Sequence, residues 1–86
     1  MADFKEKIVC ITGILPIPRR EAAEMIVANG GIFAPRVTRQ TDILVVGSLP
    51  AGRASTAKLD RASKLIAQGF PSVMASPEEF LSSIEN

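Results

Sequence analysis

The hydrophobic residues of this chain form short runs, and segments of mixed polarity separate them. The predicted strands cover residues 7–12, 32–34, 42–46 and 71–74. The first and third are aliphatic runs that end at Gly13 and Gly47, which is typical of strands covered on both faces. The second is interrupted by Pro35, which cannot donate a hydrogen bond to a neighbouring strand, so it should lie at an edge of the sheet.

Three helices are expected in the segments between and after these strands. They run from Pro18 through Asn29, from a cap at Ser55 or Thr56 to about Gln68, and from Pro77 to about Ile84. The first should end at Gly30 and Gly31, because glycine readily adopts the left-handed conformation that stops a helix. Ser76 and Glu79 have the spacing of a capping box at the start of the last helix. Strands that alternate with helices in this way predict a parallel sheet with right-handed crossovers in one α/β layer stack.

The two central strands and the second helix should supply most of the core. At about 100° per residue, Leu59, Ala62 and Ile66 define the apolar face of this helix. Lys58 falls on the border of that face, beside Leu65. The residues expected to be buried are Ile8, Cys10, Leu44, Val46, Leu59, Ala62 and Ile66.

Composition supports one globular domain over residues 1–86, with its core at about 5–85. The 86 residues are 47% hydrophobic and 22% charged, and a chain of this size can bury a core without disulfides. Cys10, the only cysteine, lies in an apolar run and is interpreted as a buried hydrophobe. The mixed charge of the N-terminus and the lack of a long apolar stretch indicate a reducing, aqueous compartment, which we expect to be the cytoplasm.

The residue types do not favour an enzyme. Without histidine, the chain lacks Ser-His and Cys-His pairs and the commonest metal ligand, so neither a metal nor a cofactor is expected. Residues 47–54 have the glycine spacing of a phosphate-binding Walker A loop. However, Arg53 replaces its lysine, Ala54 lacks the magnesium-binding hydroxyl and Pro50 removes a backbone donor. We therefore expect a non-catalytic domain.

Two segments are candidates for anion binding. Thr12 and Gly13 end the first strand, and open parallel sheets bind ligands at the carboxyl ends of their strands. A hydroxyl and a glycine N–H there can both reach an anion, although the pair could also simply turn the chain. Lys58 lies in the first turn of the second helix, where the helix dipole disfavours a cation unless an anion is nearby. The alternative is a lysine that covers apolar surface with its stem.

Positive charge is concentrated in one part of the chain although the net charge is only +1. Between residues 36 and 64 the basic residues are Arg36, Arg39, Arg53, Lys58, Arg61 and Lys64. They are opposed there only by Asp42 and Asp60, and Arg19 and Arg20 add charge at the start of the first helix. This pattern favours a local phosphate contact, with Arg61 a candidate to contact DNA. Base stacking is not indicated, because no aromatic residue is interleaved with the basic ones.

Four motifs in fixed order carry a resemblance to a known family. They are Ile-Thr-Gly at 11–13, Asn-Gly-Gly at 29–31, Thr-Asp-Ile-Leu-Val-Val-Gly at 41–47 and Lys-Leu-Asp-Arg-Ala at 58–62. Together they resemble a BRCT domain along nearly the whole chain, and most of all the single BRCT domains of bacterial NAD-dependent DNA ligases and of the large subunit of replication factor C. The resemblance implies a four-stranded parallel sheet of order 2-1-3-4, with the first and last helices on one face and the second on the other.

The resemblance also implies a site. Phosphate-binding BRCT domains hold the anion with a Ser or Thr that ends the first strand, the next Gly and a Lys of the second helix, which match Thr12, Gly13 and Lys58. In the replication factor an Arg of the first helix helps to recognise a 5′-phosphorylated DNA end. Arg19 matches this residue, with Arg20 as the alternate. The tryptophan usual in the last helix is replaced by Glu79, with Phe80 next to it, which puts the tandem-repeat phosphopeptide mode in doubt.

Two functions follow as expectations. The first is a non-catalytic module that binds a 5′ phosphate at a DNA end or nick in replication or repair, associated with the nucleoid if bacterial. The second is a protein-interaction or homodimerisation module, with a phosphorylated or other protein partner and a vestigial phosphate pocket. In either case the chain is a whole protein or a domain of a DNA ligase, polymerase or exonuclease.

Overall fold

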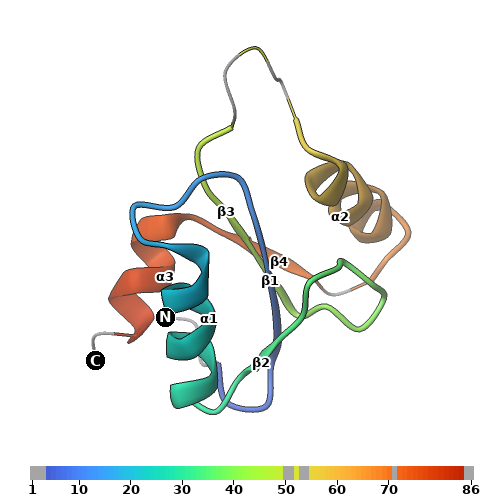
Figure 1. Ribbon diagram of the computed structural model, residues 1–86. Helices are drawn as coiled ribbons and strands as arrows, with labels where there is room; N and C mark the ends of the chain where they lie inside the picture. The colour runs from blue at the N-terminus through green and yellow to red at the C-terminus, as the bar shows by residue number, and fades with distance from the viewer. Residues whose placement is uncertain (1–3, 50–51, 53–54, 71, 85–86) are drawn as a thin grey trace.

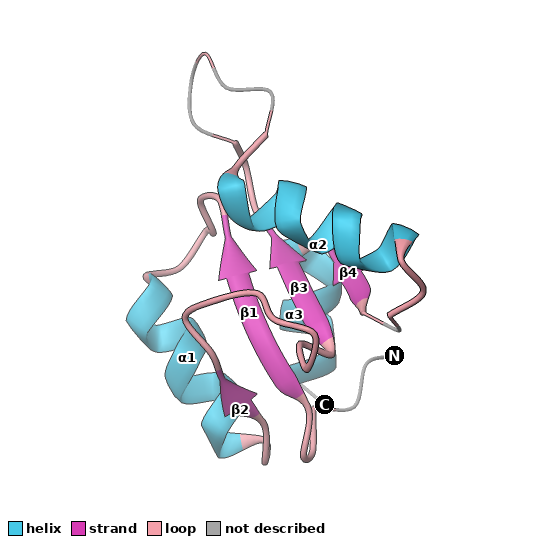
Figure 2. Cartoon of the chain, turned by 90° about the vertical axis from the view of Figure 1, so that its right-hand side faces the viewer, coloured by secondary structure: helices cyan, strands magenta, loops and turns pink. Residues whose placement is uncertain are grey.

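The computed structural model describes residues 4–49, 52, 55–70 and 72–84, and these form one four-stranded parallel sheet of order β2-β1-β3-β4 with three helices. The strands are β1 Ile8–Thr12, β2 Ile32–Phe33, β3 Ile43–Val46 and β4 Val73–Ala75, and the helices are α1 Arg19–Ala28, α2 Ala57–Ala67 and α3 Pro77–Ile84. Figure 2 shows the strands side by side and pointing the same way. The predicted element order and sheet topology are confirmed.

The helices cover both faces of the sheet, with α1 and α3 on one side and α2 on the other (Figure 1). Because successive side chains of a strand point to opposite faces, β1 contributes to both layers. Val9 and Ile11 pack toward α1 and α3, whereas Cys10 packs with α2. Phe80 of α3 is 1% exposed and meets the ring of Phe4 edge-on, with the ring centroids 5.5 Å apart. This aromatic pair is part of the core between the sheet and the α1–α3 layer.

The boundaries of two strands differ slightly from the prediction. Asp42 lies just before β3, which starts one residue later than predicted, and its carboxylate accepts a hydrogen bond from the Ile8 N–H at 2.8 Å. The last strand lies at Val73–Ala75 instead of 71–74. Ser72 is fixed before it by a 2.6 Å hydrogen bond from its hydroxyl to the Thr41 carbonyl. Pro71 is outside the described residues.

The helix ends are set largely by local signals. Pro18 stands at the cap position of α1 instead of in its first turn, and Gly30 follows the helix with φ +83°. Thr56 caps α2, where its hydroxyl accepts from the Leu59 N–H at 3.1 Å. Ser76 and Glu79 form the predicted capping box of α3. The Ser76 N–H donates to the Glu79 carboxylate, and the Glu79 N–H donates to the Ser76 hydroxyl. Pro50, Arg53 and Ala54, on which the Walker A comparison depended, lie outside the described part of the chain.

The orientation of α2 differs from the prediction. Its buried residues are Ala62 and Leu65, whereas Ile66 is 38% exposed, so the expectation for Ile66 was wrong. The face toward the sheet is centred on Ala62 and Leu65, with Leu59 packed against the same core, and the half-buried Lys58 lies beside it. Of the other residues expected in the core, Cys10, Leu44 and Ala62 are fully buried, and Ile8, Val46 and Leu59 are half-buried.

Candidate functional site

The carboxyl ends of β1 and β3 are locked together by backbone contacts. Ile14 and Ser48 exchange hydrogen bonds, with N–O distances of 2.7 Å and 2.9 Å. Gly13 has φ +79°, and a Cβ added there would lie 2.8 Å from the Gly47 carbonyl oxygen, so this turn requires glycine. The Gly13 N–H makes no backbone hydrogen bond within the described ranges, which leaves it open to a ligand.

The hydroxyl of Thr12 lies at this locked end of the sheet. Thr12 is 3% exposed, and its Oγ1 lies 2.6 Å from the Oγ1 of Thr56. Thr56 also accepts from the Leu59 N–H, so whichever hydroxyl donates across the pair, the other keeps a hydrogen with no acceptor among the described residues. The sequence predicted Thr56 only as one of two alternative caps, with Ser55 as the other. Its position two residues before Lys58 in the first turn of a helix was the available signal.

Lys58 reaches the same place from α2. Its Nζ donates to the carbonyl oxygen of Ile11 at 3.0 Å, one residue before Thr12, and its side chain is half-buried. A lysine ammonium has three N–H donors, and this contact uses one of them. The Lys58 ammonium is therefore held at the end of β1, at the residue that directly precedes Thr12 and Gly13.

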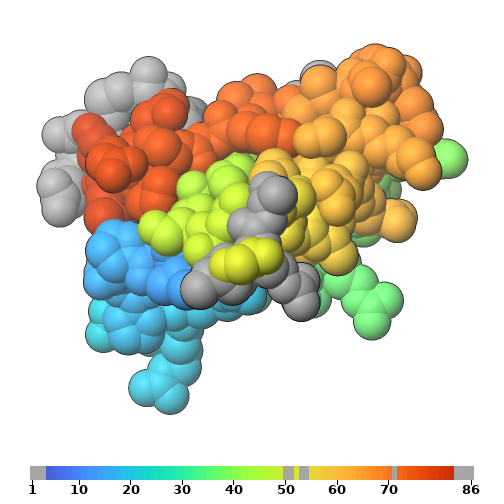
Figure 3. All heavy atoms as spheres, turned by 90° about the horizontal axis from the view of Figure 1, so that it is seen from above, coloured from blue at the N-terminus to red at the C-terminus, as the bar shows by residue number. Residues whose placement is uncertain are grey.

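Of the two arginines at the start of α1, only Arg19 joins this group. Its Nη2 donates to the Gly13 carbonyl at 2.9 Å. Arg20 instead lines a groove between α1 and β2 together with Val27 and Ile32, so it is not brought to the end of β1. We call the five residues at the end of β1, namely Thr12, Gly13, Arg19, Thr56 and Lys58, the strand-end site. Seen from above in Figure 3, the segments after β1 and β3 and the start of α2 gather at this end of the molecule.

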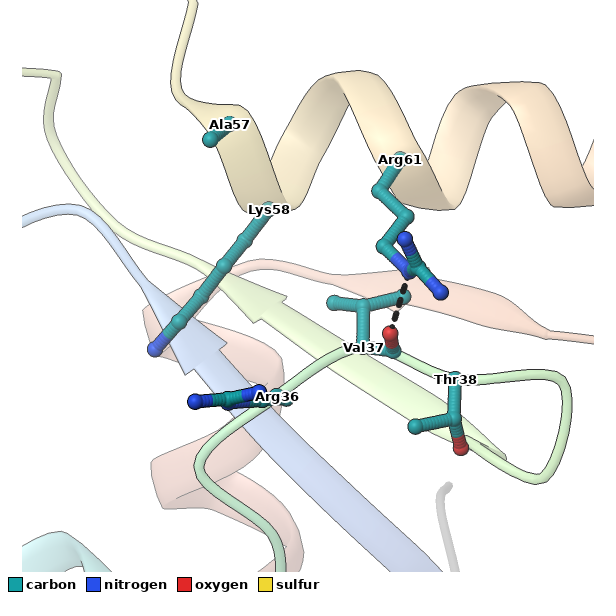
Figure 4. A pocket seen from close by; sticks show the side chains of 6 residues that line it. All are labelled: Arg36, Val37, Thr38, Ala57, Lys58 and Arg61. Atoms are coloured by element: carbon teal, nitrogen blue, oxygen red, sulfur yellow. Dashed lines mark hydrogen bonds between the residues drawn. The ribbon is translucent and has the colours of Figure 1, made fainter.

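A cavity of about 330 Å³ lies on the α2 side of the strand-end site. We call it the basic cavity; its lining residues are Arg36, Val37, Thr38, Ala57, Lys58 and Arg61. Arg61 is fixed there by a 2.6 Å hydrogen bond from its Nε to the Val37 carbonyl (Figure 4). The sequence predicted Arg36 only as one of the basic residues between positions 36 and 64. The irregular connection between β2 and β3 carries no periodic pattern that would have placed it beside α2.

The thiol of Cys10 lies beneath these residues on the α2 face of β1. Burial raises the pKa of Cys10, and the positive charges of Lys58 and Arg19 offset this only in part. A buried thiol with a raised pKa carries little thiolate at neutral pH and is a poor nucleophile.

Two further features concern metals and membranes. Across the described ranges, His, Cys, Asp and Glu residues do not gather in groups of three or more that could hold a metal ion. The three helices, as far as the structure describes them, are too short or too polar to span a bilayer.

Comparison with known proteins identifies similar sequences. The family described as the BRCA1 C Terminus (BRCT) domain matches residues 1–76. The chain is 39% identical over 78 residues to a DNA ligase of Petrotoga mobilis, a match that covers 90% of the chain and 10% of the ligase. A DNA ligase of Thermodesulfovibrio yellowstonii is 39% identical over 75 residues, which are 87% of the chain and 10% of the ligase. The chain thus spans about a tenth of the length of these relatives.

Solved structures show the same fold. The structure of Rad4 BRCT1,2 in complex with a Crb2 phosphopeptide superposes with a TM-score of 0.73 at 24% identity, covering 96% of the chain and 40% of that protein. The C-terminal BRCT domain of human XRCC1 gives a TM-score of 0.70 at 13% identity, and the match covers 96% of this chain and 79% of the XRCC1 chain. At these identities the likeness concerns the fold alone.

Proposed function

Because the chain belongs to the BRCT family, we propose that it is a non-catalytic module that binds a phosphate group on DNA, at a 5′-phosphorylated end or nick, in replication or repair. The strand-end site is the proposed phosphate site. Such a module would work beside the chromosome, in the cytoplasm of a bacterium.

The observation that carries the proposal is a convergence of hydrogen-bond donors without acceptors. At the strand-end site one hydroxyl hydrogen of the Thr12–Thr56 pair, the Gly13 N–H and two N–H groups of Lys58 have no acceptor in the described part of the chain. The guanidinium of Arg19 is held beside them by Gly13. Donors that include two cations favour a compact, multiply charged anion such as a terminal phosphate, because hydrogen bonds between charged groups are the strong ones.

The relatives favour DNA as the carrier of that phosphate. The similar sequences are DNA ligases, of which this chain matches about a tenth. We therefore infer that the module contacts the DNA end on which such an enzyme acts and takes no part in the chemistry itself. A DNA end also supplies a terminal phosphate that an intact duplex lacks.

A second candidate is a protein-interaction module. It is favoured by the groove between α1 and β2, where Val27 is 62% exposed and Ile32 is 53% exposed. The Rad4 structure, which holds a Crb2 phosphopeptide, is an example of a BRCT protein that binds another protein. In this alternative, partners contact the helices, and the strand-end site has no ligand of its own.

Titration with two DNA duplexes that differ only in a 5′ phosphate separates the candidates. The proposed function requires tighter binding of the phosphorylated duplex and a steep loss of affinity with added salt, because binding releases counterions. Equal binding of the two duplexes would show that the strand-end site is not a phosphate site. The protein-interaction alternative would then replace the proposal.

A further inference from the structure

We infer that the basic cavity is a second anion subsite, which takes the first internucleotide phosphate of the strand whose 5′ phosphate occupies the strand-end site. This inference rests on the proposed function and deepens it. The ligand becomes a 5′-phosphorylated strand recognised through two consecutive phosphates.

The first argument is the position of the two subsites along α2. Lys58 belongs to both, since it donates to Ile11 at the end of β1 and also lines the basic cavity. Arg61 follows one helical turn later on the same side, where residues three apart are neighbours. The positive charges therefore continue from the end of β1 to the connection between β2 and β3, as a strand running across α2 would require (Figure 4).

The second argument is that Arg61 is already oriented. Its Nε donates to the carbonyl of Val37, a residue only 2% exposed that packs in the core beneath α2. The guanidinium has five N–H donors, so this bond leaves the remaining ones for a ligand while fixing the plane of the group. A guanidinium held in this way loses little conformational freedom when it binds a phosphate.

The third argument is the arrangement of charge around the cavity. Arg36 is exposed, and Figure 4 shows its guanidinium extending to the same side of the cavity as the ammonium of Lys58. Its side chain makes no hydrogen bond within the described ranges, and no carboxylate lines the cavity there. Like charges directed to one place repel each other, and an anion between them would relieve that repulsion.

The remaining lining favours a phosphodiester over an acidic side chain. Val37 and Ala57 give the cavity an apolar wall beside the cations, against which a deoxyribose could pack. Successive phosphates of a DNA strand follow each other at short, regular intervals, so a strand anchored by its 5′ phosphate brings the next phosphate nearby. Base stacking would play no part, because no aromatic side chain lines the cavity in the described part of the chain.

The test uses 5′-phosphorylated duplexes in which a single internucleotide linkage is an uncharged methylphosphonate. We expect wild-type affinity to fall about tenfold when the first linkage is neutral, the effect of losing one charge-assisted contact, and to stay unchanged when a linkage well inside the duplex is neutral. Arg36→Gln should bind the normal duplex about tenfold more weakly and should lose part of the wild-type preference for a charged first linkage, while Arg61 and Lys58 keep the rest. Arg36 is exposed, so this variant should fold, which circular dichroism and thermal unfolding would verify.

Arg39→Gln is the matched control. Arg39 lies in the same connection and carries the same charge, but its guanidinium sits over the ring of Phe70, 5.6 Å from its centroid, and it does not line the cavity. It should therefore keep the wild-type preference for a charged first linkage. An equal loss in both variants would reveal a general effect of charge and overturn the inference.

Other outcomes separate the inference from the function on which it rests. If the wild-type protein prefers the 5′-phosphorylated duplex but ignores the first linkage, the second subsite is wrong and the proposed function stands. If it ignores the 5′ phosphate as well, both are wrong. If a phosphopeptide with an acidic residue beside the phosphate displaces the DNA in an Arg36-dependent way while the neutral linkage has no effect, the cavity serves a peptide, and the inference is overturned.

Discussion

Lys58 illustrates how a single side chain can serve both packing and binding. It is half-buried at the start of α2, and its ammonium is held against the Ile11 carbonyl at the end of β1. A lysine with this geometry would stabilise the contact between helix and sheet even without a ligand. Its first-turn position, however, is one that the helix dipole disfavours for a cation. A bound phosphate would offset that cost.

The first prediction concerns the contribution of Lys58 and Arg19 to phosphate binding. Lys58→Ala should weaken binding to 5′-phosphorylated DNA by about 1.5–3 kcal/mol, the range for hydrogen bonds to charged groups, while the fold stays intact. Arg19→Ala should cost less, because its guanidinium is exposed and shares its donors with Gly13. Fluorescence anisotropy with labelled duplexes measures both losses. Lys64→Ala, on the exposed side of α2, serves as the control, and a Lys58→Ala affinity equal to wild type would contradict the site.

The second prediction concerns Cys10, which is buried in β1 and whose pKa burial raises. Because a raised pKa lowers the thiolate fraction at any given pH, the native protein should react with a thiol reagent only slowly at neutral pH. Labelling should become fast when urea unfolds the chain. Rapid labelling of the native protein would show that Cys10 is not buried in the way described.

At the scale of elements, the junction of β1 and β3 shapes the strand-end site. Two chain segments that leave neighbouring strands approach each other so closely that Gly13 and Gly47 have no room for a side chain. This contact fixes the Gly13 N–H and the Thr12 hydroxyl in position before any ligand arrives. Rigid placement of donors reduces the entropy that binding would otherwise lose.

A third prediction tests this junction. Gly13→Ala should destabilise the domain by about 1–3 kcal/mol, because the new Cβ meets the Gly47 carbonyl oxygen at 2.8 Å in a left-handed conformation. Gly69→Ala is the control, since Gly69 has φ +99° with open space around it. Urea denaturation gives both free energies of unfolding. Equal losses in the two variants would mean that the close approach adds nothing beyond the backbone conformation.

A fourth prediction concerns the packing of α2 on β3. Leu44 is fully buried beneath α2, so Leu44→Ala should cost about 2–5 kcal/mol of unfolding free energy. Ile66→Ala should cost far less, because its side chain is 38% exposed. The same denaturation series compares them. A loss below about 0.5 kcal/mol for Leu44→Ala would place β3 away from the centre of the sheet.

At the scale of the whole molecule, basic side chains are concentrated in one region although the net charge is only +1. Arg19, Arg36, Lys58 and Arg61 come from three separate parts of the chain and gather at or beside one end of the sheet. A protein with this distribution should have little attraction for DNA in general. Its affinity should instead depend on a particular phosphorylated end.

The fifth prediction expresses this as salt dependence. The plot of log affinity against log salt concentration should be steeper for the 5′-phosphorylated duplex than for the unphosphorylated one, by about one unit per additional phosphate neutralised. Titrations at several salt concentrations with both duplexes give the two slopes. Parallel lines would indicate general electrostatic attraction without recognition of the end.

The features that the sequence alone predicted depend mostly on residues that are close together in the chain. The aliphatic runs around Cys10 and Leu44 predicted the two central strands, and the capping box at Ser76 and Glu79 predicted the last helix. These signals lie within a few residues of the structure they specify, which is why they hold without knowledge of the fold. Thr12 and Lys58 were found as candidates because strand ends and helix starts can be located from the same local signals.

The tertiary structure alone decided how these elements face one another. Whether Leu65 or Ile66 is buried depends on the angle at which α2 lies on the sheet, and an amphipathic pattern leaves that rotation open by tens of degrees. Arg19 and Arg20 are neighbours in sequence but lie about 100° apart on the helix, so only one turns toward Gly13. The pairing of Thr12 with Thr56 and the arrival of Arg36 beside Lys58 join residues far apart in the chain. Such contacts are fixed only when the layers pack, because no local preference specifies them.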